Sequence, residues 1–161
     1  MKKIFFILFI IISITNSSYA ASSSSNTKTT TSNYDKAVKL IKFAKKYEKK
    51  GKVDKANKRY EKALDLLLKS NKKKPNNADI LNYLGFTTRK LGDFKTGEKY
   101  YLEGLAIEPN HIGINEYLGE LYVATNRVGL AKERLEILKD CNCEEYKELK
   151  EIIDGTKKSK Y

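Results

Sequence analysis

Residue types that break helices or bind metal ions are scarce in this chain of 161 residues. Proline occurs only as Pro75 and Pro109, tryptophan is absent, and the single histidine is His111. The scarcity of proline favours helices. The two cysteines and the one histidine are one ligand short of a closed zinc site. Glycine-rich phosphate loops, nucleophile–histidine pairs and metal-ligand sets are also missing. We predict no catalytic residue, no metal, no cofactor and no small-molecule substrate.

Long apolar runs are limited to the start of the chain. The run Ile4–Ile12 is about half of the roughly 20 residues needed to span a bilayer. Lys2 and Lys3 precede it, and small residues at 18–20 suit a signal peptidase. We expect residues 1–20 to be a cleaved signal peptide, with an uncleaved anchor or a buried helix as the alternatives. The protein is then exported, to the periplasm if the source is Gram-negative and otherwise secreted, and no following cysteine offers a lipid anchor.

Residues 21–33, ASSSSNTKTTTSN, contain a single apolar residue, Ala21. Such a segment cannot bury enough apolar surface to offset the entropy of ordering it. We therefore expect a flexible Ser/Thr-rich linker there. The folded domain is predicted to cover residues 34–154, and residues 155–161 form a basic tail.

A repeat with a period of 34 residues is the strongest pattern in the sequence. When residues 78–111 are aligned with residues 112–143, Leu84-Gly85 falls on Leu118-Gly119. Within the first of these segments, apolar and small residues at helical spacing form two stripes, separated by Gly92-Asp93. Glycine ends one helix and aspartate caps the next, so each repeat is predicted to be a pair of closely packed helices.

A degenerate repeat precedes these two, at about residues 37–77. The distance from Ala63 to Pro75 is seven residues longer than its counterpart in the next unit, so we expect a second helix longer by two turns. A final helix at about 144–154 would cap the array. In the degenerate repeat, the residues that keep the internal spacing are Phe43, Ala44, Tyr47, Gly51, Val53, Ala56, Tyr60 and Ala63.

This pattern resembles the tetratricopeptide repeat (TPR) family. The matching residues are Leu81, Leu84, Gly85, Gly92, Asp93, Phe94, Gly97, Tyr101, Gly104 and Pro109. The departures are Thr88, where an aromatic is usual, and Gly97 and Gly104, where alanine is usual. The resemblance implies an all-α, right-handed α-solenoid in a small exported bacterial TPR protein, with three helix-turn-helix units at about 37–77, 78–111 and 112–143 and a C-terminal capping helix at 144–154. A generic helical bundle is the alternative.

Proteins of this family are interaction modules whose first helices line a concave groove for a peptide or a partner helix. The resemblance implies that the chain is a non-enzymatic protein-interaction scaffold. An ordinary solvated face is the alternative for each position. By position in the repeat, the groove residues are Lys45, Lys49, Asn82, Phe86, Arg89, Lys90, Glu116 and Glu120, with Ile41, Glu48, Asp79 and Val123 beside them.

Phe86 is expected to be exposed, because it lies off the apolar stripe of its helix. It would then anchor a peptide between Asn82, Arg89 and Lys90. On this interpretation, replacing Phe86 and Arg89 together by alanine abolishes partner capture and leaves the helical content intact. One TPR subgroup clamps a C-terminal carboxylate, but only Lys45 matches its residues, so we do not expect that clamp.

Positive charge is concentrated in the first unit. Residues 34–74 hold 16 lysines and arginines against 5 acidic residues, whereas residues 75–161 hold 13 against 15. This block favours an acidic protein or an anionic surface, so the alternative function is an envelope-surface protein whose basic first repeat binds anionic lipid or polymer. Nucleic acid is not an expected partner of an exported protein. A Lys-rich face that serves only solubility is the remaining interpretation.

Cys141-Asn142-Cys143 is predicted to lie between the last repeat helix and the capping helix. Paired cysteines in an exported chain suggest a disulfide, here a local one that holds the cap. Asn142 would have to turn the chain out of helix for the bond to form. Two free thiols or a thiol-redox role are the alternatives, and His111 is expected to be a turn residue.

Overall fold

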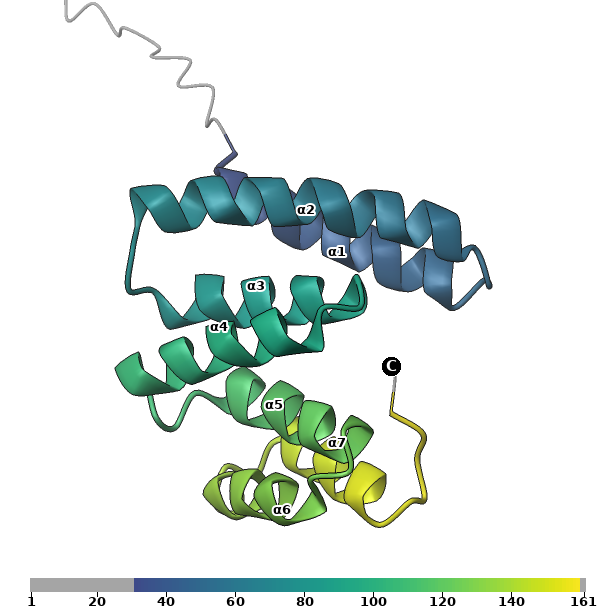
Figure 1. Cartoon of the computed structure of the whole chain (residues 1–161), viewed down its shortest axis with the longest axis vertical. Coiled ribbons are helices and arrows are strands. Elements are labelled where there is room, and N and C mark those ends of the chain that lie inside the picture. Colours follow the sequence, from purple (N-terminus) through teal and green to yellow (C-terminus); the bar gives the residue numbers. More distant parts are fainter. Residues whose placement is uncertain (1–30, 160–161) are drawn as a thin grey trace, which may run out of the picture. The chain divides into compact units, whose positions relative to one another are not determined.

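A computed structural model describes residues 31–159 of the chain, so the predicted signal peptide and most of the predicted linker lie outside the described residues. All regular secondary structure in this range is α-helical (Figure 1). They form three antiparallel pairs, α1–α2, α3–α4 and α5–α6, followed by α7; we call the pairs the first, second and third units. The helices are α1 (Asn33–Glu48), α2 (Val53–Lys73), α3 (Ala78–Lys90), α4 (Phe94–Ile107), α5 (Ile112–Ala124), α6 (Val128–Ile137) and α7 (Glu144–Ile153).

Polar side chains set the start of four helices. The Oγ of Ser32 accepts the N–H of Asp35 at α1, and the Oδ1 of Asn77 accepts the N–H of Ile80 at α3. Asp93 and His111 accept equivalent N–H groups at the starts of α4 and α5. These caps satisfy backbone donors that have no partner inside the helix, which is why the helices begin there.

The cap at Asp93 makes part of the stability dependent on pH. The hydrogen bond from the Thr96 N–H, 3.0 Å long, lowers the pKa of Asp93 below its ordinary value of 3.8. Since the folded pKa is below the unfolded one, the stabilisation is complete above the unfolded pKa and is lost as the pH falls through the folded pKa. Asp93→Asn keeps a capping acceptor but does not titrate. We expect a shallower decline of its melting temperature below about pH 4 than in the parent chain, and equal slopes would contradict this account.

Close contact between α3 and α4 depends on small residues, as predicted from the sequence. A Cβ atom at Gly85 would lie 2.5 Å from the Cε1 of Tyr101, and one at Gly97 would lie 3.0 Å from the Gly85 carbonyl oxygen. Tyr101 is fully buried and fills the space that the glycine leaves. Interior packing of this density leaves no room for a further methyl group.

The apolar core runs through the stack from unit to unit. The first and second units share one cluster, in which Ala63 and Leu67 of α2 meet Leu81 and Leu84 of α3. The second and third units share another, around Tyr101, Ile114 and Leu118. Each unit therefore buries its apolar stripe only by stacking on its neighbour, as in other repeat proteins.

Helix α2 is longer than its counterpart in the second unit. It has 21 residues, whereas α4 has 14. The additional residues before Pro75 are thus helical, which confirms the expectation of two further turns. A bilayer-spanning segment is not found among the helices of residues 31–159, none of which is both long and apolar enough.

Helix α7 packs on α5 and α6 and ends the stack on its C-terminal side. Leu149 and Ile152 are buried, and Leu149 lies directly against Gly119 of α5. In the preceding turn, Cys141 and Cys143 are joined by a disulfide with their Cα atoms 5.1 Å apart. Asn142 between them has a φ of 49°, a left-handed conformation that asparagine tolerates better than most residues.

Candidate functional site

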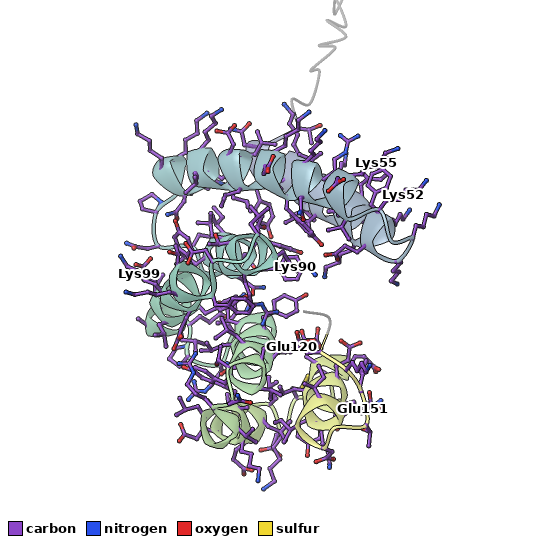
Figure 2. All side chains as sticks on the ribbon, turned by 45° about the vertical axis from the view of Figure 1, so that its right-hand side comes forward. Lys52, Lys55, Lys90, Lys99, Glu120 and Glu151 are labelled. Atoms are coloured by element: carbon purple, nitrogen blue, oxygen red, sulfur yellow. A yellow bond between two sulfur atoms is a disulfide. The ribbon has the colours of Figure 1, made fainter. Side chains whose placement is uncertain are left out.

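Side chains of α1, α3, α5 and α7 meet on one side of the stack, which we call the inner face. In Figure 2, Lys90 and Glu120 lie on this side of the ribbon, and the yellow helix α7 lies beside Glu120. Basic groups come mainly from the first and second units and acidic groups mainly from α5 and α7. The members of the inner face are Lys45, Glu48, Phe86, Arg89, Lys90, Glu116, Tyr117, Glu120 and Glu148.

The centre of the inner face is a lysine placed over two aromatic rings. The Nζ of Lys45 lies 4.4 Å from the centroid of the Phe86 ring and donates a hydrogen bond of 3.3 Å to the hydroxyl of Tyr117. The Phe86 and Tyr117 rings are 5.1 Å apart, and the ring of Tyr60 packs on Phe86 from α2. All three units therefore contribute to one polar and aromatic cluster, which a cation–π contact helps to hold together.

Two ion pairs flank this centre. Arg89 donates to the Glu120 carboxylate at 3.2 Å and to the backbone carbonyl of Tyr117 at 2.6 Å, and both charged side chains are fully buried. On the other side, Lys90 pairs with Glu48 at 2.6 Å. The Arg89–Glu120 pair excludes water and holds both side chains in one geometry, because separating them would leave a buried charge.

The tyrosines of the site remain hydrogen-bond donors in neutral solution. Burial, reinforced by the Glu116 carboxylate, raises the pKa of Tyr117 above its ordinary value. Burial and the Glu48 carboxylate do the same for Tyr60, whose hydroxyl donates to Glu48 at 2.9 Å. Both hydroxyls therefore keep their protons and help to fix the charged groups beside them.

Three carboxylates gather where α5 meets α7. Oxygen atoms of Glu116, Glu120 and Glu148 all lie within 4.8 Å of one another. Carboxylate oxygens are the ligands that hard cations prefer, so these are the described residues that could hold a metal ion. Positive charge is already present in the structure, because Arg89 pairs with Glu120 and Lys157 lies 3.1 Å from Glu148.

The prediction that Phe86 is an exposed anchor is wrong. Its side chain is 2 % exposed and packs between Tyr60 and Tyr117. Helix α3 belongs to the middle unit, so helices on both sides pack against it. They cover more of the surface of α3 than the single apolar stripe that the sequence predicted. The double replacement of Phe86 and Arg89 would therefore remove core packing and a buried charge, and would not leave the fold intact.

The structure places the predicted groove residues in different surroundings. Asn82, Arg89, Glu116 and Glu120 are buried, although a groove surface would expose them. Lys45, Phe86, Arg89, Lys90, Glu116 and Glu120 do lie together on the inner face, with Lys45 half-buried. Lys49 is instead an exposed residue that directly follows α1, and Asn82 lies against Gly113 of α5.

Tyr117 and Glu148 are members of the site that the sequence did not predict. Tyr117 lies between Glu116 and Leu118 and one turn before Glu120, so its position beside a predicted groove residue was a usable signal. Glu148 comes from α7, which has no place in the repeat pattern. Its contribution depends on how α7 packs on α5, and that packing is not encoded in the spacing of the repeats.

Three stacked helix pairs with a glycine-mediated contact inside the second unit and a closing helix define a TPR-type α-solenoid. The fold is similar to that of the first TPR domain of Spaghetti (RPAP3), whose solved structure holds the HSP90 peptide SRMEEVD. The two agree with a TM-score of 0.53 at 23% identity, over 78% of this chain and 96% of that one. At this identity the similarity shows the fold alone. The chain matches no protein-family profile and no curated protein sequence.

Proposed function

We propose that this chain is a non-enzymatic protein-interaction scaffold that binds a peptide or a partner helix on its inner face. The observation that supports this most directly is the contact of Lys45 in the first unit with Phe86 in the second and Tyr117 in the third. A surface built by three units from rigid, ion-paired side chains loses little entropy when a ligand binds. The peptide held by the TPR domain of RPAP3 adds an analogy at the level of the fold.

The side chains that would contact the partner are those of the inner face that retain exposed surface. These include Lys45 and Tyr117, both half-buried, together with Glu48 and Glu148, which are 30% and 21% exposed. The buried Arg89, paired with Glu120, donates to the backbone carbonyl of Tyr117 and so helps to position that residue. We propose a partner segment that carries both acidic and basic groups, because complementary charges fix orientation and register.

Crosslinking on the inner face tests this proposal. A photoreactive phenylalanine analogue replaces Tyr117 in one sample and Leu102, an exposed residue of α4, in the other. After irradiation in the native envelope, we expect a discrete crosslinked partner from position 117 and none from position 102. The same pattern from both positions, or no product from position 117, would count against binding on the inner face.

Lys45→Met then measures the contribution of the charge to binding of the captured partner. Methionine keeps an unbranched side chain over the Phe86 ring, and loss of a charge-assisted contact is expected to weaken binding about tenfold or more. Lys132→Met, on the exposed side of α6, removes the same charge elsewhere and should leave the affinity unchanged. Melting temperatures of both variants establish that the fold is retained. Equal affinities for the two variants would refute the role of Lys45.

A further inference from the structure

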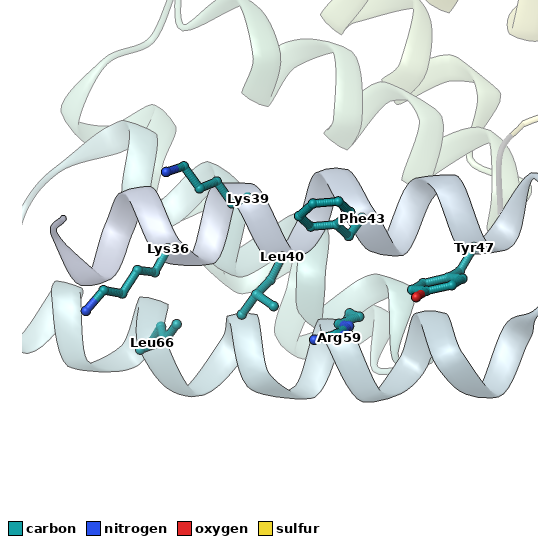
Figure 3. Close-up of a pocket in the computed structure, with 7 residues that line it drawn as sticks. All are labelled: Lys36, Lys39, Leu40, Phe43, Tyr47, Arg59 and Leu66. Atoms are coloured by element: carbon teal, nitrogen blue, oxygen red, sulfur yellow. The ribbon is translucent and has the colours of Figure 1, made fainter.

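An open groove runs along the first unit between α1 and α2. It has a volume of about 470 Å³, and Figure 3 shows Leu40 and Leu66 facing each other between the two helices. Phe43 projects beside them and is 53% exposed. We call this surface the first-unit groove; its lining residues are Lys36, Lys39, Leu40, Phe43, Tyr47, Arg59 and Leu66.

Two apolar residues that α1 contributes to this groove, Leu40 and Phe43, occupy positions that are buried in the next unit. In the alignment of the first two units, Leu40 and Phe43 correspond to Leu81 and Leu84, 41 residues later. Leu81 and Leu84 are buried in the core that α3 forms with the first unit. Of the described helices, α1 packs closely on α2 and α3, and it reaches α5 through the Lys45 side chain on the inner face. The first unit thus carries the apolar surface on which a helix of a preceding unit would pack.

The rim of the groove is basic. Lys36, Lys39 and Arg59 line it, and none of the seven described residues that form it is acidic. Towards the turn between α1 and α2, the same surface continues over Lys55, Lys58 and Lys62. Acidic side chains lie beside the groove at the α2 edge, where Glu61 and Asp65 are found and Asp65 pairs with Lys69 at 2.7 Å, and at the start of α1, where Asp35 lies near Lys39.

We infer that the first-unit groove binds an acidic amphipathic helix of a partner protein. A helix fits because the apolar positions are those that contact a neighbouring helix one unit later. Its apolar residues, at i, i+3, i+4 and i+7, would cover Leu40, Phe43 and Leu66, and its acidic residues would face Lys36, Lys39 and Arg59. This surface is distinct from the inner face and does not depend on the function proposed there.

Other occupants fit the groove less well. Residues 1–33 of the chain itself contain no aspartate or glutamate, so they cannot supply the charge that the rim requires. A bilayer favours apolar side chains that project beyond the basic ones, whereas Leu40 and Leu66 are half-buried between the helices. A second copy of the chain would use its helices α6 and α7, in which basic and acidic residues are mixed and the excess of acidic residues is small.

Binding of synthetic helices to the full chain tests the inference. The probe is a fluorescent amphipathic helix of about four turns with leucines on one face and glutamates on both flanks; a second probe carries lysine in place of glutamate. We expect saturable binding of the acidic probe only, weakened about tenfold or more by Phe43→Ser and by raising the salt from about 0.05 to 0.5 M. Leu102→Ser, which alters an apolar residue of similar exposure on α4, should leave binding unchanged.

Further measurements separate the competing occupants. Vesicles of equal parts phosphatidylglycerol and phosphatidylcholine should not bind in a Phe43-dependent manner, and sedimentation should show no Phe43-dependent self-association. Phe43-dependent binding to the vesicles, Phe43-dependent self-association, or probe binding that Phe43→Ser leaves unchanged would overturn the inference. Lys45→Met serves as a cross-control, because it should weaken binding at the inner face without affecting the acidic probe. The two proposals can therefore fail separately.

Discussion

Replacing Arg89 by alanine is expected to lower the free energy of unfolding by about 3–5 kcal/mol. The guanidinium is fully buried, pairs with Glu120 and donates to the backbone carbonyl of Tyr117. Its removal leaves a carboxylate and a carbonyl group in a site closed to water. Domains of this size are stable by only about 5–15 kcal/mol, so the variant should lose a large share of its stability. Urea denaturation followed by circular dichroism measures the effect.

Two controls distinguish a buried ion pair from a general effect of losing arginine. Arg127→Ala breaks a pair with Glu98 in which both side chains are partly exposed, and should cost only about 1 kcal/mol. Replacing Arg89 by methionine and Glu120 by leucine in the same chain removes both charges and should recover much of the lost stability. An Arg89→Ala variant as stable as Arg127→Ala would show that the Arg89 site is open to water.

Gly85→Ala is expected to destabilise the chain by about 1–3 kcal/mol, although alanine favours helices. The new Cβ would lie 2.5 Å from the ring of Tyr101, and that ring is fully buried and cannot move away. Helices α3 and α4 would have to separate. The midpoint of thermal or urea denaturation gives the change in stability.

The matched control is Gly129→Ala in α6. A Cβ atom there meets no other atom within 4 Å, so only helix propensity changes and the variant should gain about 0.5–1 kcal/mol. Opposite signs for the two substitutions would locate the effect in the α3–α4 contact. Tyr101→Leu combined with Gly85→Ala should cost less than the sum of the two single changes, because the smaller side chain relieves the clash. Stabilisation by both glycine replacements would refute the close packing.

The helix pairs could be predicted from the sequence because their determinants are local. Gly85, Gly97 and Tyr101 lie at fixed spacings within one unit, and each unit contains its own turn and cap. The burial of Phe86 could not be predicted in this way, since it depends on how completely the neighbouring helices cover α3. The repeat pattern describes one unit at a time and carries no information on that coverage.

The candidate site could likewise be predicted only in part from the sequence. Family positions identified Lys45, Arg89 and Glu120 as neighbours, but their spacing could not distinguish a side chain that faces a partner from one paired inside the fold. Likewise, net charge identified the first unit as basic without indicating which lysines lie beside an apolar groove. Both distinctions require the distances between helices that are far apart in the sequence.

The hydrogen bond from Lys45 to Tyr117 has a consequence for how the domain unfolds. In an ideal repeat array each unit touches only its neighbours, so an end unit can fray while the rest persists. Here the Lys45 side chain of α1 contacts Phe86 in the middle unit and also bonds to Tyr117 of α5 in the third. Detaching the first unit therefore removes support from the third as well, and this couples the opposite ends of the array into a single cooperative transition.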